Sequence, residues 1–323
     1  MHLTLEPEGS LKHGRLDAKV NFTMVVEFIL LGFSDLPNLQ GFLFGIFLVI
    51  YLSILIGNGL IIIITKTDPS LQTPMYYFLG NFSFLEICYA SVTVPRMLTD
   101  LWTHNGNISL WACAVQLCFF LILGVTECFL LAVMAYDRYV AICKPLYYFL
   151  IMRHHVCIGF VVGSWILGIP VVIGLTYQIF SMPFCDSVKL NHVFCDIYPV
   201  LQVACGDTSM NELSVYADVV FFGMIPFIWI LNSYMRIITT IMKMPSATGR
   251  SKAFSTCSSH LTVVSLFFVT AILTHLRTKT SHSAVTERVL SLLYTTMTPL
   301  VNPIIYSLRN KDVIVALRKL LPT

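Results

Sequence analysis

Seven long runs of apolar residues follow one another along the chain, separated by short polar segments. Each run has at least about 20 residues, the length an α-helix needs to cross the hydrocarbon core of a bilayer. The pattern predicts an all-α protein, a bundle of seven transmembrane helices close to 42–64, 78–98, 112–142, 156–175, 212–242, 254–275 and 285–308.

Little of the chain is left outside these runs. We expect an extracellular N-terminal segment over 1–41, a single helix bundle over 42–310 and a cytoplasmic tail over 311–323. Residues 312–320 alternate charged and apolar positions, which is typical of a short amphipathic helix on the inner membrane surface. The first segment has no apolar core followed by a cleavage-type site, so we expect no removable signal peptide.

Composition and charge agree with a membrane protein and predict its orientation. Hydrophobic residues make up 56% of the chain, charged residues only 11%, and the mean hydropathy is +0.78. With the N-terminus outside, twelve of the 20 Lys and Arg residues fall on the inner side, where only Asp68, Asp137 and Asp312 offset them. This bias is typical of a cytoplasmic face, and it accounts for the net charge of +3 without a nucleic-acid partner. An N-glycosylation acceptor at Asn21 lies on the expected outer side.

Two glutamates lie deep inside predicted helices, where an ionised side chain costs about 2.5 to 3.5 kcal/mol. At a rise of 1.5 Å per residue, Glu86 and Glu127 each lie about 16 Å from the inner face, so they share one level. Two carboxylates at one depth repel each other, so either one keeps its proton or a cation lies between them. The alternative is a protonated carboxyl bonded to a neighbouring helix.

Arg138 lies where the third apolar run reaches the inner face. It follows Glu127 by 11 residues, which turn an ideal helix through about 1100°, so the two side chains share one face, which we expect to point into the bundle. Asp137 does not face its neighbour on the helix, which leaves Arg138 free to contact another helix or an outside partner. The alternative is an interfacial anchor that snorkels towards water.

Four motifs carry a resemblance to a known family. They are PMYYFLGNFSFLE (74–86), MAYDRYVAIC (134–143), KAFSTCSSHLTVV (252–264) and PLVNPIIYSLRN (299–310). Together they resemble the olfactory receptors, a branch of the rhodopsin-like G-protein-coupled receptors, and they span most of the chain. The chain departs from the family at Phe268-Val269, where relatives commonly have Tyr-Gly, and in the unusually long segment before Asn21.

The resemblance implies a function. It implies a plasma-membrane receptor of olfactory neuron cilia that binds small volatile, mainly hydrophobic molecules. On activation it would engage a heterotrimeric G protein of the olfactory stimulatory type and so raise cyclic AMP. The lipid bilayer is then its other partner, and no cofactor is expected apart from a candidate sodium ion at Glu86 and Glu127. Coupling and switching are implied for Asp137, Arg138, Tyr139, Tyr234, Asn302, Pro303 and Tyr306.

Four of the ten cysteines lie at or beyond the outer ends of the predicted helices, in an oxidising compartment. Their spacing alone leaves three pairings open. The family arrangement implies disulfides between Cys113 and Cys195 and between Cys185 and Cys205. Such bridges either brace the long loop over 177–211 or hold it as a lid above a pocket.

A ligand pocket is expected in the outer half of the bundle, between the third, fifth and sixth helices and below the long loop. Most of the candidate wall residues are apolar and would serve equally well as ordinary core packing. If Asp218 faces inward, it could pair with an amine, with a protonated His275 or with a polar odorant; if it faces outward, it is solvated near the membrane surface. The candidate walls are Leu121, Gly124, Val125, Asp218, Phe222, Phe268, Ala271, Ile272, His275 and Thr295.

Other classes of protein account for the sequence less well. An intramembrane enzyme needs a nucleophile or a metal cluster, and the chain has no HExxH, GxGD or DHHC string, so we expect neither an enzyme nor a metal site. Paired acids inside the membrane would suit a transporter, but no internal repeat is visible. A chemosensory receptor outside the nose, with the same mechanism and a different ligand, is the nearest alternative.

Overall fold

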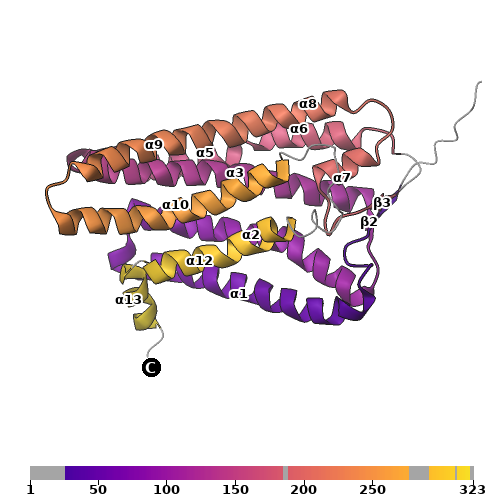
Figure 1. The fold of residues 1–323 in the computed structure, drawn as a ribbon, viewed down its shortest axis with the longest axis horizontal. Coiled ribbons are helices and arrows are strands. Elements are labelled where there is room, and N and C mark those ends of the chain that lie inside the picture. The colour runs from indigo at the N-terminus through magenta and orange to yellow at the C-terminus, as the bar shows by residue number, and fades with distance from the viewer. Residues whose placement is uncertain (1–25, 185–187, 276–290, 310, 321–323) are drawn as a thin grey trace, which may run out of the picture.

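The computed structural model describes residues 26–184, 188–275, 291–309 and 311–320. Its long helices lie side by side in one elongated bundle (Figure 1). Each predicted apolar run coincides with one helix or with two consecutive helices, except that residues 285–290 lie outside the described part. The helices are α1 (Gln40–Thr67), α2 (Pro74–Thr103), α3 (Leu110–Cys143), α4 (Tyr148–Ile151), α5 (His154–Ile166), α6 (Ile169–Phe180), α7 (Ile197–Gln202), α8 (Ser209–Asp218), α9 (Ile225–Met242), α10 (Ala247–His275), α12 (Thr298–Arg309) and α13 (Lys311–Leu320).

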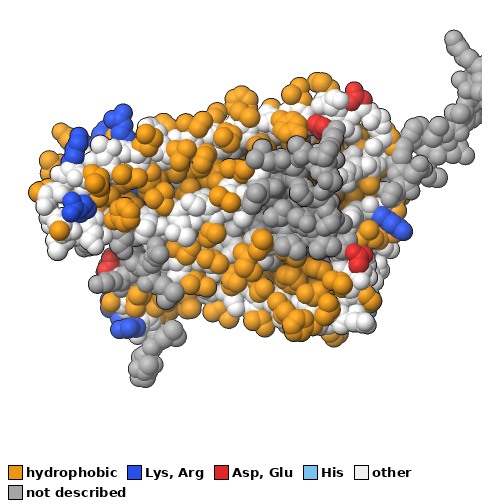
Figure 2. Space-filling model, viewed as in Figure 1, with side chains coloured by type: hydrophobic (Ala, Val, Ile, Leu, Met, Phe, Trp, Pro, Cys, Tyr) orange, Lys and Arg blue, Asp and Glu red, His pale blue; other side chains and the backbone are white. Residues whose placement is uncertain are grey.

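The flank of the bundle is apolar. Within the described residues, four helical stretches are long and apolar enough to cross a membrane: Pro37–Thr67, Leu110–Cys143, His154–Phe180 and Ser209–Met242. In the first and last of these, only 22% and 17% of the most apolar window is buried, so most of its side chains face outwards. Figure 2 shows apolar side chains along the flank and most of the visible Lys and Arg at the end that carries α13. This distribution fits a protein whose sides contact lipid and whose basic end faces the cytoplasm.

Prolines interrupt two of the helical rods. One π-helical turn, Val219–Met224, joins α8 to α9, and these three elements together form the α8–α9 rod. Another π-helical turn, Leu293–Met297, precedes α12. Each lies just before a proline, Pro226 or Pro299, whose missing N–H leaves the carbonyl four residues earlier without its helical partner. The wider turn accommodates that carbonyl, and such turns are frequent at functional sites.

The fourth predicted span is not one continuous helix, because α5 and α6 separate at Leu167 and Gly168. Gly168 packs directly against α3, where a Cβ atom would lie only 2.5 Å from Val125 Cγ1. Only glycine permits this approach. The contact fixes the distance between α3 and α6 at the depth of Val125.

A small sheet covers the outer end of the bundle, opposite α13 (Figure 1). Strand β1 (Glu27–Leu30) lies between β2 (Asn107–Ser109), to which it is antiparallel, and β3 (Lys189–Leu190), to which it is parallel. Phe28, Ile108 and Leu190 bury their side chains beneath the sheet. This sheet was not predicted, and it ties the N-terminal segment to the loop between α2 and α3 and to the long loop after α6.

The predicted amphipathic helix is present as α13. Val313 and Ala316 are buried against the bundle, whereas Arg318 and Lys319 are exposed. Lys319 Nζ forms an ion pair with Asp68 Oδ2 at 3.0 Å, which links α13 to the turn between α1 and α2. Helix α13 is thereby held at the inner end of the bundle.

Candidate functional site

A cavity of about 410 Å³ lies in the outer half of the bundle. Its walls come from α3, α6, the α8–α9 rod, α10 and the loop that contains α7. Apolar and aromatic side chains dominate these walls, and Asp196, Tyr198, Tyr216, Asp218 and Ser291 supply the polar ones. A shape of this kind, apolar with a few polar groups, is typical of small-molecule sites.

Most of the predicted wall residues line this cavity. They are Leu121, Gly124 and Val125 from α3, Asp218 and Phe222 from the α8–α9 rod, and Phe268, Ala271 and Ile272 from α10. Thr295 is buried but does not line the cavity; its hydroxyl donates to the carbonyl of Ser291 at 2.8 Å. The side chain of His275 lies outside the described part of the structure.

Phe268, one of the two departures from the family pattern, is part of an aromatic group at the cavity wall. Its ring centroid lies 4.7 Å from that of Phe227 on α9 and 5.1 Å from that of Phe267. Phenylalanine therefore joins α10 to α9 through ring contacts, where a tyrosine would also have brought a hydroxyl.

The outer loop contributes walls that the sequence did not reveal. Phe194, Asp196, Ile197 and Tyr198 line the cavity from above, and Val172 and Leu175 line it from α6. Burial raises the pKa of Tyr198 to about 12, with smaller contributions from nearby Tyr216 and Asp196, so the phenol is a neutral hydrogen-bond donor at physiological pH. The one available signal was Cys195: a disulfide from it to the top of α3 must draw its neighbours over the bundle.

That disulfide is present, and it joins Cys113 to Cys195 as the resemblance implied. Cys205 is also disulfide-bonded, but Cys185 lies outside the described residues, so their pairing stays a prediction. Asn21, the expected glycosylation site, likewise lies outside the described residues.

Two polar side chains hold the loop beside the disulfide. Gln116 on α3 accepts from the Cys195 amide at 3.1 Å and donates to the Val92 carbonyl at 3.0 Å, so it connects the loop to α2 and α3. His192 is fully buried; its Nδ1 lies 2.8 Å from the Phe194 carbonyl and its Nε2 lies 2.6 Å from Ser291 Oγ. The described part of the loop is thus fixed to Gln116 on α3 and to Ser291, and these contacts hold it as a roof over the cavity.

Deeper in the bundle, the structure brings Glu86 and Glu127 together. Both are at most 2% exposed, and they lie close enough to repel each other electrostatically. The Asn302 amide donates to Glu86 Oε1. Three buried oxygens here have no hydrogen-bond partner among the described residues: Glu86 Oε2, Glu127 Oε1 and Asn302 Oδ1. No group of three or more His, Cys, Asp or Glu side chains in the described chain is arranged to hold a metal ion.

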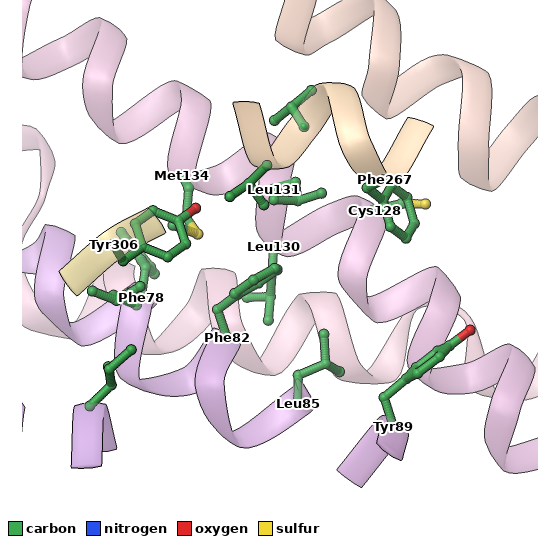
Figure 3. Close-up of a cluster of buried hydrophobic side chains, with 14 of the residues drawn as sticks. Phe78, Phe82, Leu85, Tyr89, Cys128, Leu130, Leu131, Met134, Phe267 and Tyr306 are labelled. Carbon is green, nitrogen blue, oxygen red and sulfur yellow. The ribbon is translucent and has the colours of Figure 1, made fainter. Parts of the chain in front are cut away.

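The remaining predicted switch residues meet at the inner ends of the helices. Arg138 is 8% exposed and lies within electrostatic reach of Tyr234 on α9, His260 on α10 and Tyr306 on α12. Tyr234 and His260 are joined by a hydrogen bond of 2.7 Å between the hydroxyl and Nδ1. The Tyr306 hydroxyl has no hydrogen-bond partner among the described residues. Figure 3 shows the Tyr306 ring beside Phe78 and Met134 within the buried core.

The two residues that flank Arg138 have other contacts. Asp137 accepts a hydrogen bond from the Tyr148 hydroxyl at 2.9 Å, so it faces α4 rather than its neighbour. The Tyr139 ring lies 5.9 Å from Lys144 Nζ. Among the described residues, carboxylates lie next to Arg96, Lys319 and, at 4.0 Å, the imidazole of His192, so Arg138 has no carboxylate partner there.

The first and last helices meet at Pro303, the proline of the last motif. A Cβ atom on Gly57 would lie 3.2 Å from Pro303 Cβ, so α1 and α12 touch at this point. Nearby, Asn58 Nδ2 donates to the Pro299 carbonyl at 3.1 Å. A side chain of α1 thereby satisfies a backbone group in the irregular part of the last helix.

Comparisons with known proteins agree with this geometry. A family model described as olfactory receptor matches residues 47–323. Olfactory receptor 10AG1 of Homo sapiens is 58% identical over 92% of this chain and 98% of its own length, and olfactory receptor 10C1 of Homo sapiens is 52% identical over 93% and 96%. In fold, the chain is similar to the crystal structure of squid rhodopsin, with a TM-score of 0.71 at 18% identity over 88% of this chain and 85% of that one.

Proposed function

Because the chain belongs to the olfactory receptor family, we propose that it takes a small, mainly apolar odorant into the cavity between α3, α6, the α8–α9 rod and α10. The observation that carries this proposal is the cavity of about 410 Å³ with its mostly apolar walls. Small-molecule sites are typically about 300 to 1,000 Å³, and burial of an odorant contributes roughly 25 cal/mol for each Å² of apolar surface removed from water. Affinity then comes from the apolar walls, and selectivity from the few polar groups.

Activation follows from differential binding. A ligand that binds the active arrangement ten times more tightly than the inactive one stabilises the active arrangement by about 1.4 kcal/mol. Helix α3, the α8–α9 rod and α10 line the cavity, and the same three carry Arg138, Tyr234 and His260 at their inner ends. A shift of these helices against one another at the cavity therefore changes the surroundings of Arg138.

The inner end around Arg138 is the surface that meets the G protein in this proposal. Arg138 has five N–H donors and no carboxylate partner among the described residues; it is buried here, so a separation of the inner helix ends would expose it to a partner protein. We assign the partner to the stimulatory olfactory type, with cyclic AMP as the output and the cilia of olfactory neurons as the site of action. Tyr234 and Tyr306 border this surface and act as its switch.

Sodium is the ion that suits the buried acidic pair. The unpartnered oxygens of Glu86, Glu127 and Asn302 are hard ligands of the kind that alkali and alkaline-earth cations take. One positive charge between the two carboxyls would remove their repulsion. These three residues would hold the ion, and its charge would stabilise the arrangement of α2, α3 and α12 in which they meet.

The test is a cyclic AMP assay in cells that co-express the receptor and the stimulatory olfactory G protein, with surface level measured by an N-terminal tag. A panel of volatile odorants should give a dose-dependent rise that Arg138→Ala abolishes at unchanged surface level. Arg153→Ala is the matched control, because it removes an exposed cation at the start of α5 on the same face and should leave the response unchanged. A full response in Arg138→Ala would refute the assignment of the coupling surface.

A further inference from the structure

The charged side chains among the described residues of the cavity wall are all acidic. Among the described residues that line it, two carry carboxylates, Asp196 and Asp218, and none is a lysine, arginine or histidine. An apolar cavity with uncompensated negative charge favours a ligand that brings a positive one.

Asp196 is engaged by the protein itself. Its Oδ1 accepts from the Ile197 amide at 2.7 Å at the start of α7, and its Oδ2 lies 4.0 Å from the buried Nε2 of His192. This carboxylate therefore helps to hold the roof. Substitution of Asp196 would therefore be expected to change the loop structure rather than ligand binding alone.

Asp218 is different. It is half-buried, lines the cavity, and forms no hydrogen bond or ion pair with any described residue. Its place in the cavity wall corresponds to the inward one of the two positions considered for it. A carboxylate drawn partly out of water without a partner is unfavourable, and a cationic group from a ligand would restore the lost interactions.

The local backbone explains the position of Asp218. It is the last residue of α8, directly before the π-helical turn Val219–Met224. The turn contains one residue more than an α-helical turn of the same height, so it changes which side chains above it face the bundle. Pro226 follows the turn closely, and Asp218 directly before the turn and Phe222 within it both line the cavity.

Around Asp218 the walls suit an ammonium ion with an apolar body. Phe222 and Phe268 line the same cavity, and aromatic faces attract cations by about 0.5 to 2 kcal/mol. Leu121, Val125 and Ile272 offer apolar surface for the remainder of such a ligand. An ion pair in this partly dry site is stronger than one in water.

We propose, on the basis of the function proposed above, that this receptor selects small apolar amines, bound as ammonium ions with their charge paired by Asp218. The amine enters already protonated, so no proton transfer is required. A neutral alcohol of the same carbon skeleton fills the same walls but leaves Asp218 unpaired, so it binds more weakly.

The experiment compares primary alkylamines and arylalkylamines with the alcohols of the same skeletons, on wild type and on three variants. Asp218→Asn keeps the size and removes the charge, Asp218→Glu keeps the charge, and Asp35→Asn removes an exposed acidic charge at the outer end as the matched control. Cyclic AMP gives the response. Thermal stabilisation of the purified receptor by the same amines gives binding without any G protein.

Amines should act at concentrations at least tenfold below those of their alcohols. Asp218→Asn should raise the effective concentrations of the amines at least tenfold and change those of the alcohols by no more than about twofold. Asp218→Glu should keep the preference for amines, and Asp35→Asn should behave as wild type. Responses to neutral odorants with none to amines would overturn this inference and leave the proposed function standing. If amines stabilise the purified receptor in a way that depends on Asp218 but cause no rise in cyclic AMP, the amine site stands and the proposed G-protein signalling is refuted. If no amine stabilises the purified receptor, the inference is wrong.

Discussion

The disulfide between Cys113 and Cys195 should be the main covalent support of the cavity roof, and its removal gives the sharpest test of that role. The perturbation is a set of three variants: Cys113→Ala, Cys195→Ala and the double variant. Both cysteines are fully buried, and their Sγ atoms are bonded to each other across 82 residues of chain. Alanine at Cys195 leaves the backbone amide that donates to Gln116 in place, so the substitution removes the disulfide but not this hydrogen bond.

The magnitude follows from the length of the closed loop. For a separation of 82 residues, the chain-entropy relation gives about 4.5 kcal/mol of stabilisation against a fully unfolded chain. In a bilayer the helices on either side of the loop remain inserted and already limit its freedom. The loss should therefore be at most about 4.5 kcal/mol, which is still a large share of the stability of a protein.

The assay is the midpoint of thermal unfolding of the detergent-solubilised receptor, followed by size-exclusion chromatography. All three variants should lose the same amount, because one missing thiol breaks the bond as fully as two. Cys118→Ala, a free and half-buried cysteine on the same helix, is the matched control and should stay near wild type. A double variant that loses the sum of the two single losses would show that the cysteines act through packing rather than through their bond.

Two further outcomes are expected. Hydrogen bonds from Ser70 and Lys319 lower the pKa of Asp68 from 3.8 to about 2, so their stabilisation is complete above pH 3.8 and is lost as the pH falls towards 2. The difference in thermal midpoint between wild type and Asp68→Asn should accordingly shrink over that range, and a difference that persists at pH 2 would contradict the assignment. At the cavity, Ala271→Leu adds volume to a wall and should cost a ligand about 1 to 3 kcal/mol, or roughly a 5- to 150-fold rise in effective concentration; an unchanged response at equal surface level would place the ligand elsewhere.

The bundle could be predicted from the sequence because a bilayer imposes strict demands on it. Length and hydropathy give the helices, and the Lys and Arg bias gives the expected inner face. Two smaller features of the fold could not be predicted from the sequence. The break at Gly168 depends on its contact with Val125, a tertiary neighbour. The outer sheet depends on β1 meeting two loops far away in sequence. Neither leaves a periodic signal in the chain.

The same contrast holds for the cavity. Its helical walls could be predicted because depth along a helix follows from counting residues, and Asp218, Phe222 and Ala271 all line it. Phe194 and Tyr198 could not, because a loop has no period and its path is set by a disulfide and by hydrogen bonds to Gln116 and Ser291. The roles of the switch residues stay predictions, since a single arrangement of the helices does not display a change between two.

The position of the π-helical turn gives a physical route from cavity to inner surface. Asp218 lies directly before this turn and Tyr234 lies 16 residues later in the same helical rod, a distance of about 24 Å at the helical rise. A regular α-helix transmits a rotation at its outer end rigidly, but a π turn has a looser hydrogen-bond pattern that can absorb or release it. A charge drawn towards Asp218 acts on one side of this joint, and the Tyr234–His260 hydrogen bond lies on the other. In the proposed mechanism, an amine paired with Asp218 would favour a second packing of the turn, and the resulting rotation of α9 would carry Tyr234 with it without any direct push on the inner helix ends.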